Sequence, residues 1–117
     1  MTALPVLVVE DSFLIAASLE DSLQQAGLRV LLAGSVAEAE AHLVDTGFIA
    51  ALLDLMLPDG DSLDLARRLP EGGCKVALVS GADRDIVPAD PAIAAHFSKP
   101  FEDNTVIDWV KSVSRAA

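Results

Sequence analysis

Acidic side chains stand where two short apolar runs of the sequence end. Glu10 and Asp11 directly follow the run at residues 4–9, and Asp54 directly follows the run at residues 49–53. Short runs rich in Val, Ile and Leu are typical of buried strands in a parallel sheet. We therefore expect the carboxylates at the carboxyl ends of two strands, which is the edge where open α/β sheets bind ligands.

Carboxylates gathered at one sheet edge repel one another unless a cation lies among them. A divalent metal ion relieves this repulsion, and oxygen ligands with no His or Cys beside them favour Mg²⁺ over Zn²⁺. The sequence therefore predicts a Mg²⁺ site that includes Glu10, Asp11 and Asp54.

Two further strand ends carry groups that suit a phosphoryl ligand. Ser80 follows the run at residues 75–79 and supplies a hydroxyl, and Lys99 follows residues 95–98 and supplies a cation. A carboxylate can accept a phosphoryl group covalently when Mg²⁺ and a lysine neutralise the oxygens in transfer. Asp54 is the predicted acceptor.

The elements that must position these residues alternate between strand and helix. Capping serines and apolar residues at helical spacing predict the helices, and Pro88 and Pro91 limit the fourth of five to a short or distorted one. The predicted strands are 4–9, 28–33, 49–54, 75–79 and 95–98; the other helices are 12–26, 35–47, 62–69 and 103–114, and 55–61 is a loop. Such alternation implies a parallel sheet with helices on both faces.

The composition indicates one compact domain over residues 1–117. With 52% hydrophobic residues, the chain can form a sizeable core, and it has no apolar run long enough to span a membrane. A net charge of −10 argues against nucleic acid and anionic membranes as direct partners, because phosphate binding needs clustered Lys and Arg. Cys74 is the only cysteine and no signal-peptide pattern is present, so we expect a cytoplasmic protein.

Taken together, these motifs resemble those of response-regulator receiver domains. Each motif alone is common, but the set occurs in order at the ends of four predicted strands and covers essentially the whole chain. The matching motifs are Glu10-Asp11, Asp54 with Pro58, Ser80-Gly81 and Lys99-Pro100-Phe101. The resemblance implies a flavodoxin-like, doubly wound, five-stranded parallel sheet with strand order 2-1-3-4-5.

The resemblance also implies a function in two-component or phosphorelay signalling. Asp54 would take a phosphoryl group from a sensor histidine kinase or a histidine phosphotransferase. Asp11, Asp54 and the backbone carbonyl of Met56 would bind Mg²⁺ directly, and Glu10 would act largely through water. Such a domain is a switch and not an enzyme, with at most weak self-phosphorylation and autophosphatase activity, and its phosphorylation can drive homodimer formation.

The switch residues follow from the same resemblance. Ser80 would move to the phosphoryl oxygens and Lys99 would pair with them, with the Lys99-Pro100 bond cis. The family usually has an aromatic residue three positions before the lysine, where this chain has His96. His96 is therefore predicted either to act as a smaller switch or to make the response sensitive to pH.

Other positions depart from the family pattern. Ser62 stands where glycine is common, and the stretch between Ser80 and Lys99 is short and rich in proline, as in receivers attached to, or working beside, some sensor kinases. Met56 and Ala82 occupy positions that influence attack by water, and neither can orient a water molecule. We therefore hypothesise slow self-dephosphorylation.

Two other functions remain open at this point. A receiver-like scaffold that binds partners without phosphorylation is compatible with His96, Ser62 and the irregular fourth helix, although the intact acids argue against it. A Mg²⁺-dependent phosphohydrolase with Asp54 as nucleophile would need a general acid where the chain has Met56. Phe13, Leu14 and Ala17 form apolar surface on the first helix, which either fills the core or receives a partner helix.

Overall fold

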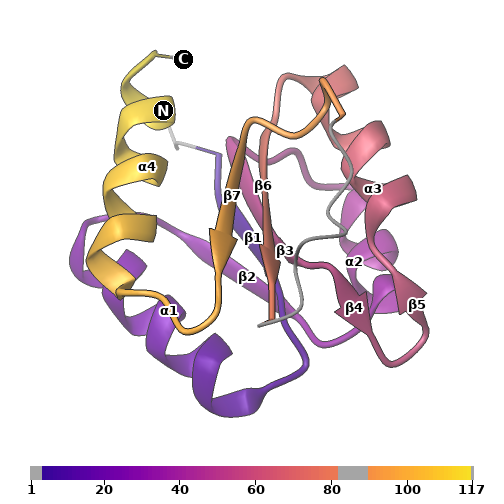
Figure 1. Ribbon diagram of the computed structural model, residues 1–117. Coiled ribbons are helices and arrows are strands. Elements are labelled where there is room, and N and C mark those ends of the chain that lie inside the picture. The colour runs from indigo at the N-terminus through magenta and orange to yellow at the C-terminus, as the bar shows by residue number, and fades with distance from the viewer. Residues whose placement is uncertain (1–3, 82–89, 117) are drawn as a thin grey trace.

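The computed structural model describes residues 4–81 and 90–116 of the chain, and its centre is a parallel sheet (Figure 1). The sheet has five strands in the order β2-β1-β3-β6-β7. The strands are β1 (Val6–Val9), β2 (Val30–Ala33), β3 (Ala50–Asp54), β6 (Lys75–Ser80) and β7 (Ala95–Ser98). This order confirms the predicted flavodoxin-like fold, and each strand lies within a residue or two of its predicted range.

Helices cover both faces of the sheet, as predicted. In Figure 1, α1 and α4 lie on one side of the sheet, and α2 and α3 lie on the other. Their bounds are α1 (Phe13–Gln25), α2 (Val36–Leu43), α3 (Leu63–Arg68) and α4 (Asp103–Ala116), and a short 3-10 helix, η1 (Leu69–Gly72), follows α3. The predicted short helix near Pro88 falls on residues 82–89, outside the described part of the chain. Within the described ranges, no helix has both the length and the apolar character needed to cross a bilayer.

Side chains of the central strands are buried on both faces, because each face carries a helical layer. Leu7 and Val9 pack into the core beneath α2 and α3, whereas Val6 and Val8 pack against α1 and α4. Residues of a strand alternate between the two faces. A strand buried on both faces therefore has an uninterrupted apolar sequence, which is why these strands were visible in the sequence.

The cap of α1 fixes where the helix begins, directly after the acidic pair. The Ser12 hydroxyl accepts a hydrogen bond from the Ile15 N–H at 3.4 Å. The helix buries Ala16, Leu19 and Leu23, while Ile15 stays half-buried. The cap and this apolar stripe together orient the turn that carries Glu10 and Asp11.

Two predicted boundaries differ from the structure. Helix α2 ends at Leu43, short of the predicted Gly47, although the Thr46 N–H still bonds the His42 carbonyl in a following turn. The predicted loop at residues 55–61 contains a small antiparallel ribbon of β4 (Met56–Leu57) and β5 (Gly60–Asp61). Strands of two residues carry no detectable periodicity, so the sequence could not reveal this ribbon.

Asp59, in the turn between β4 and β5, ties this ribbon to α2. Its Oδ1 and Oδ2 accept hydrogen bonds from the N–H groups of Val36 and Ala37 at 2.9 and 3.0 Å. These hydrogen bonds, with that of Val36 the largest cause, lower the pKa of the Asp59 carboxyl group. A carboxylate at a helix N-terminus satisfies N–H groups that have no partner within the helix.

We expect Asp59→Asn to lower the urea midpoint of unfolding at pH 7, because the amide keeps one oxygen for one N–H group and its NH2, which is a donor, would face the other N–H group. A carboxyl group with a lowered folded-state pKa stabilises the fold above its ordinary pKa of 3.8. The difference between variant and wild type should therefore shrink as the pH falls through the folded-state pKa. Glu71→Gln, at an exposed carboxylate on η1, is the matched control and should change the midpoint little. Equal midpoints for Asp59→Asn and wild type at pH 7 would show that the hydrogen bonds of Asp59 with α2 do not stabilise the fold.

Candidate functional site

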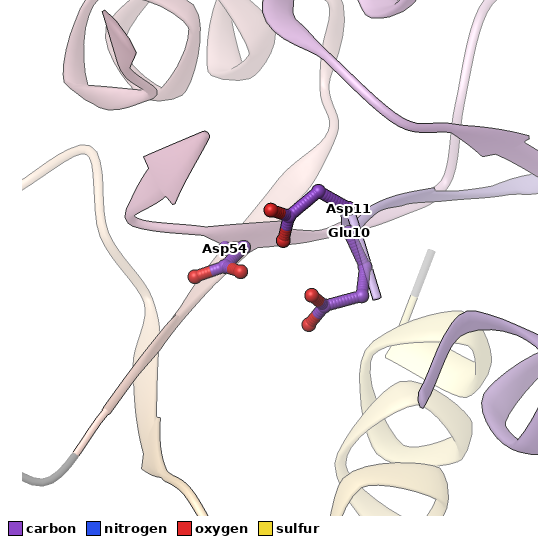
Figure 2. Close-up of side chains that lie close together, drawn as sticks. All are labelled: Glu10, Asp11 and Asp54. Carbon is purple, nitrogen blue, oxygen red and sulfur yellow. The ribbon is translucent and has the colours of Figure 1, made fainter. Parts of the chain in front are cut away.

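The sheet brings Glu10, Asp11 and Asp54 together (Figure 2). Each offers a carboxylate oxygen, and these oxygens all lie within 4.8 Å of one another. The sheet register explains the proximity, because Val9 at the end of β1 pairs with Leu53, so that the residues that follow them leave adjacent strands side by side. The structure thus confirms the prediction that the three acids lie together at one edge of the sheet.

Lys99 joins this cluster from the end of β7. Its Nζ lies 2.9 Å from Glu10 Oε1 and 3.0 Å from Asp54 Oδ2. Glu10 and Asp54 are both buried, at 6% and 7% exposure, whereas Asp11 is exposed. The cluster thus holds three carboxylates and the ammonium of Lys99, which leaves an excess of negative charge that a divalent cation would balance.

Burial and ion pairing change the pKa of Glu10 and the pKa of Lys99. Burial raises the pKa of Glu10, although hydrogen bonds from the Lys99 ammonium and the Ser12 N–H oppose this effect. Burial disfavours the charged form of Lys99, but its hydrogen bonds with Glu10 and Asp54 outweigh burial and raise the Lys99 pKa. Lys99 is therefore a permanent cation in the site at neutral pH.

Backbone hydrogen bonds hold the strand ends that carry these side chains. The Glu10 N–H donates to the Ala33 carbonyl at 2.9 Å, and the Lys99 N–H donates to the Ser80 carbonyl at 2.7 Å. The Lys99-Pro100 peptide bond is cis, as the resemblance implied. The site residues are thus continuous with the sheet and do not lie on free loops.

Ser62 precedes α3, where a serine often caps a helix, but its side chain makes a different contact. No hydrogen bond from its side chain caps α3. The Ser62 hydroxyl is fully buried and donates instead to the backbone carbonyl of Asp54 at 2.8 Å. Ser62 therefore holds the backbone of the candidate acceptor in place. A serine at a position where the family often has glycine was the sequence signal that could have revealed this contact.

The remaining predicted site residues lie around this centre. Ser80 is buried at 3% exposure, and its hydroxyl lies 2.7 Å from Nε2 of His96. Met56 lies in β4, two residues beyond Asp54, with its side chain 67% exposed. Ala82 falls outside the described residues. Phe13 and Leu14 are 80% and 79% exposed, so they do not fill the core and the surface interpretation of these two residues is correct.

Comparison with known proteins gives a consistent result. Residues 6–111 match the sequence model of a family described as "Response regulator receiver domain". The chain is 31% identical over 115 residues to the swarming motility regulation protein RssB of Serratia marcescens, covering 94% of this chain and 52% of that protein. It spans about half the length of the curated relatives it matches.

Solved structures share the fold over nearly the whole chain. A CheY-like receiver domain protein from Methanospirillum hungatei JF-1 superposes with a TM-score of 0.83 at 22% identity, covering 98% of this chain and 96% of that one. A CheY-like receiver domain from Methylobacillus flagellatus superposes with a TM-score of 0.82 at 25% identity, covering 96% of this chain and 99% of that one. The likeness in fold and the match in sequence therefore point to the same family.

Proposed function

Because the chain belongs to the response regulator receiver domain family, we propose that it is the phosphoacceptor domain of a two-component or phosphorelay system and that Asp54 takes the phosphoryl group. The observation that supports this most strongly is the position of Lys99, whose ammonium lies 3.0 Å from Asp54 within the cluster formed with Glu10 and Asp11. This arrangement provides a nucleophile and a fixed positive charge for the phosphoryl oxygens.

In the proposed transfer, a carboxylate oxygen of Asp54 attacks the phosphorus of a phosphohistidine. The N–P bond breaks, and the histidine ring of the donor leaves and takes up a proton. Lys99 neutralises part of the charge on the phosphoryl oxygens, and Ser62 holds the Asp54 peptide in place.

The donor set suits a magnesium ion. We propose that Glu10, Asp11, Asp54 and the backbone carbonyl of Met56 hold Mg²⁺, Glu10 largely through water. These are hard oxygen ligands, and the combined negative charge of the three carboxylates exceeds the single positive charge of Lys99 beside them. When bound, Mg²⁺ supplies charge neutralisation at the phosphoryl oxygens.

The domain acts in this proposal as a cytoplasmic switch with a long-lived phosphorylated state. Met56 lies two residues beyond the acceptor and is exposed, and a thioether cannot orient an attacking water molecule. Hydrolysis of the acyl phosphate is therefore slow, and the signal persists until another protein removes it.

We propose that the histidine-bearing helix of the donor docks on α1. Phe13 and Leu14 are exposed there, separated from the acidic pair by Ser12 alone. Leu14 also lines a groove of about 410 Å³ together with Lys99 and Phe101. Because Lys99 contacts Asp54, a helix seated in this groove would bring its histidine to the acceptor.

The double variant Phe13→Ser/Leu14→Ser tests this docking face. We expect transfer to fall at least about ten-fold, since two exposed apolar anchors are removed. The donor for the assay is whichever autophosphorylated histidine kinase labels the wild type most strongly in a panel. Phosphorylation by acetyl phosphate, which needs no docking, should stay unchanged. Val44→Ser, at another exposed apolar residue, is the control. Undiminished transfer to the double variant would place the donor elsewhere.

The experiment that tests the function as a whole is incubation with acetyl phosphate, with and without Mg²⁺, followed by intact mass. A Mg²⁺-dependent phosphoryl adduct on the wild type supports the receiver function. The absence of an adduct would favour the scaffold, and continuous turnover of phosphate esters would favour the phosphohydrolase.

A further inference from the structure

A hydrogen bond joins the two residues that the sequence singled out as a switch. Ser80 Oγ lies 2.7 Å from His96 Nε2. Ser80 is buried on β6, whereas His96 is exposed on β7, at the edge of the sheet. The bond therefore connects the interior beside the acceptor with the surface of the molecule.

Ser80 is placed where a phosphoryl group on Asp54 would need a donor. Val79 pairs with Asp54 across the sheet, and Ser80 is the next residue. The Ser80 carbonyl also accepts a hydrogen bond from the Lys99 N–H, so the serine and the lysine lie side by side at the ends of their strands. A phosphoryl group on Asp54 would add strong acceptor oxygens at this same edge.

The direction of the bond with His96 decides whether the Ser80 proton is available to that group. A serine hydroxyl has a single proton, and an imidazole nitrogen either accepts a hydrogen bond or carries a hydrogen and donates one. When Nε2 is unprotonated, the Ser80 hydroxyl donates its hydrogen bond to His96. When Nε2 carries a hydrogen, Ser80 accepts from it, and its own proton can be donated elsewhere.

We propose that His96 is a positioning residue that holds the Ser80 hydroxyl and competes with the phosphoryl group for its proton. This inference rests on the proposed phosphorylation of Asp54. When Ser80 donates to the phosphoryl oxygens, the imidazole of His96 loses or reverses its hydrogen bond. Because His96 is exposed at the edge strand, this change alters the surface that a partner protein meets.

Nitrogen NMR of the imidazoles tests the proposal directly. The chain has two histidines, and His42 serves as an internal control, since its Nε2 lies 3.0 Å from the Leu32 carbonyl on the far edge strand. We expect acetyl phosphate and Mg²⁺ to shift the ring nitrogen resonances of His96 and to leave those of His42 in place. In Ser80→Ala, the His96 resonances should no longer respond to phosphorylation.

A double-mutant cycle gives an independent readout. His96→Phe keeps an aromatic ring but frees the Ser80 proton, so we expect phosphorylation by acetyl phosphate to become about five-fold faster, as the loss of one competing neutral hydrogen bond predicts. In the Ser80→Ala background, the same substitution should have no effect. His96→Gln, whose amide can bond the hydroxyl again, should return the rate toward that of the wild type.

The outcomes separate this inference from the function on which it rests. Equal effects of His96→Phe in both backgrounds would show that His96 acts only through packing and would overturn the proposal. The proposal would also be overturned if the wild type forms the adduct and the His96 resonances do not move. A wild type that forms no adduct would overturn the phosphoacceptor function, and this inference with it.

Discussion

Asp54→Asn abolishes the Mg²⁺-dependent phosphoryl adduct that the wild type gains from acetyl phosphate; this is the expected result with the largest effect. Asparagine has nearly the same size and shape as aspartate, but its amide is not a nucleophile at phosphorus. Asp54 is buried and its carboxylate contacts Lys99, which is the placement that the proposed acceptor needs. Intact mass of both proteins after equal incubation measures the effect.

The control for Asp54→Asn must remove one negative charge outside the site. Asp64→Asn meets this need, because Asp64 is an exposed residue in the first turn of α3. This variant should acquire the adduct as the wild type does. An adduct of undiminished yield on Asp54→Asn would show that another side chain accepts the group, and peptide mass spectrometry would then identify it.

The second large effect is expected from Lys99→Met, which keeps the length of the side chain and removes its charge. Glu10 and Asp54 would then be two buried carboxylates without their cation. Removing one partner of a buried ion pair costs about 3 kcal/mol, so the free energy of unfolding at pH 7 in metal-free buffer should fall by roughly that amount. The phosphorylation rate should fall on the order of 100-fold, as when a preorganised donor to the transition state is lost.

The pH dependence of Lys99→Met has a definite sign. Burial already raises the pKa of Glu10 in the wild type, and loss of the lysine raises it further. The folded state then binds more protons than the unfolded state, so its stability falls as the pH rises above the ordinary glutamate pKa of 4.5. The stability that the variant lacks at pH 7 should therefore be recovered as the pH is lowered toward that value.

Urea unfolding at several pH values measures this recovery. Lys75→Met, at an exposed lysine that begins β6 at the opposite end of the sheet, is the matched control and should change neither stability nor phosphorylation much. A Lys99→Met protein as stable as the wild type at pH 7 would mean that the carboxylates do not depend on this ammonium.

The fold was more predictable than the contacts within the site. The strands were apparent because burial on both faces demands unbroken apolar runs, and α1 was apparent because Ser12 and its apolar spacing mark its start and its inner side. The ribbon β4–β5 was missed because each of its strands has only two residues. The role of Ser62 was missed because a serine before a helix is ordinarily its cap.

The order of residues along the chain is enough to show which side chains leave the carboxyl ends of the strands, and therefore that acids, a hydroxyl and a lysine meet at one edge. This information is local, because apolar periodicity and caps act within a single segment. The contacts of Lys99 with both Glu10 and Asp54 become apparent in the folded molecule alone. The same is true of the hydrogen bond from Ser62 to the Asp54 carbonyl and of the one between Ser80 and His96. Such contacts depend on the register between strands and on side-chain orientation, which all the packed neighbours set together.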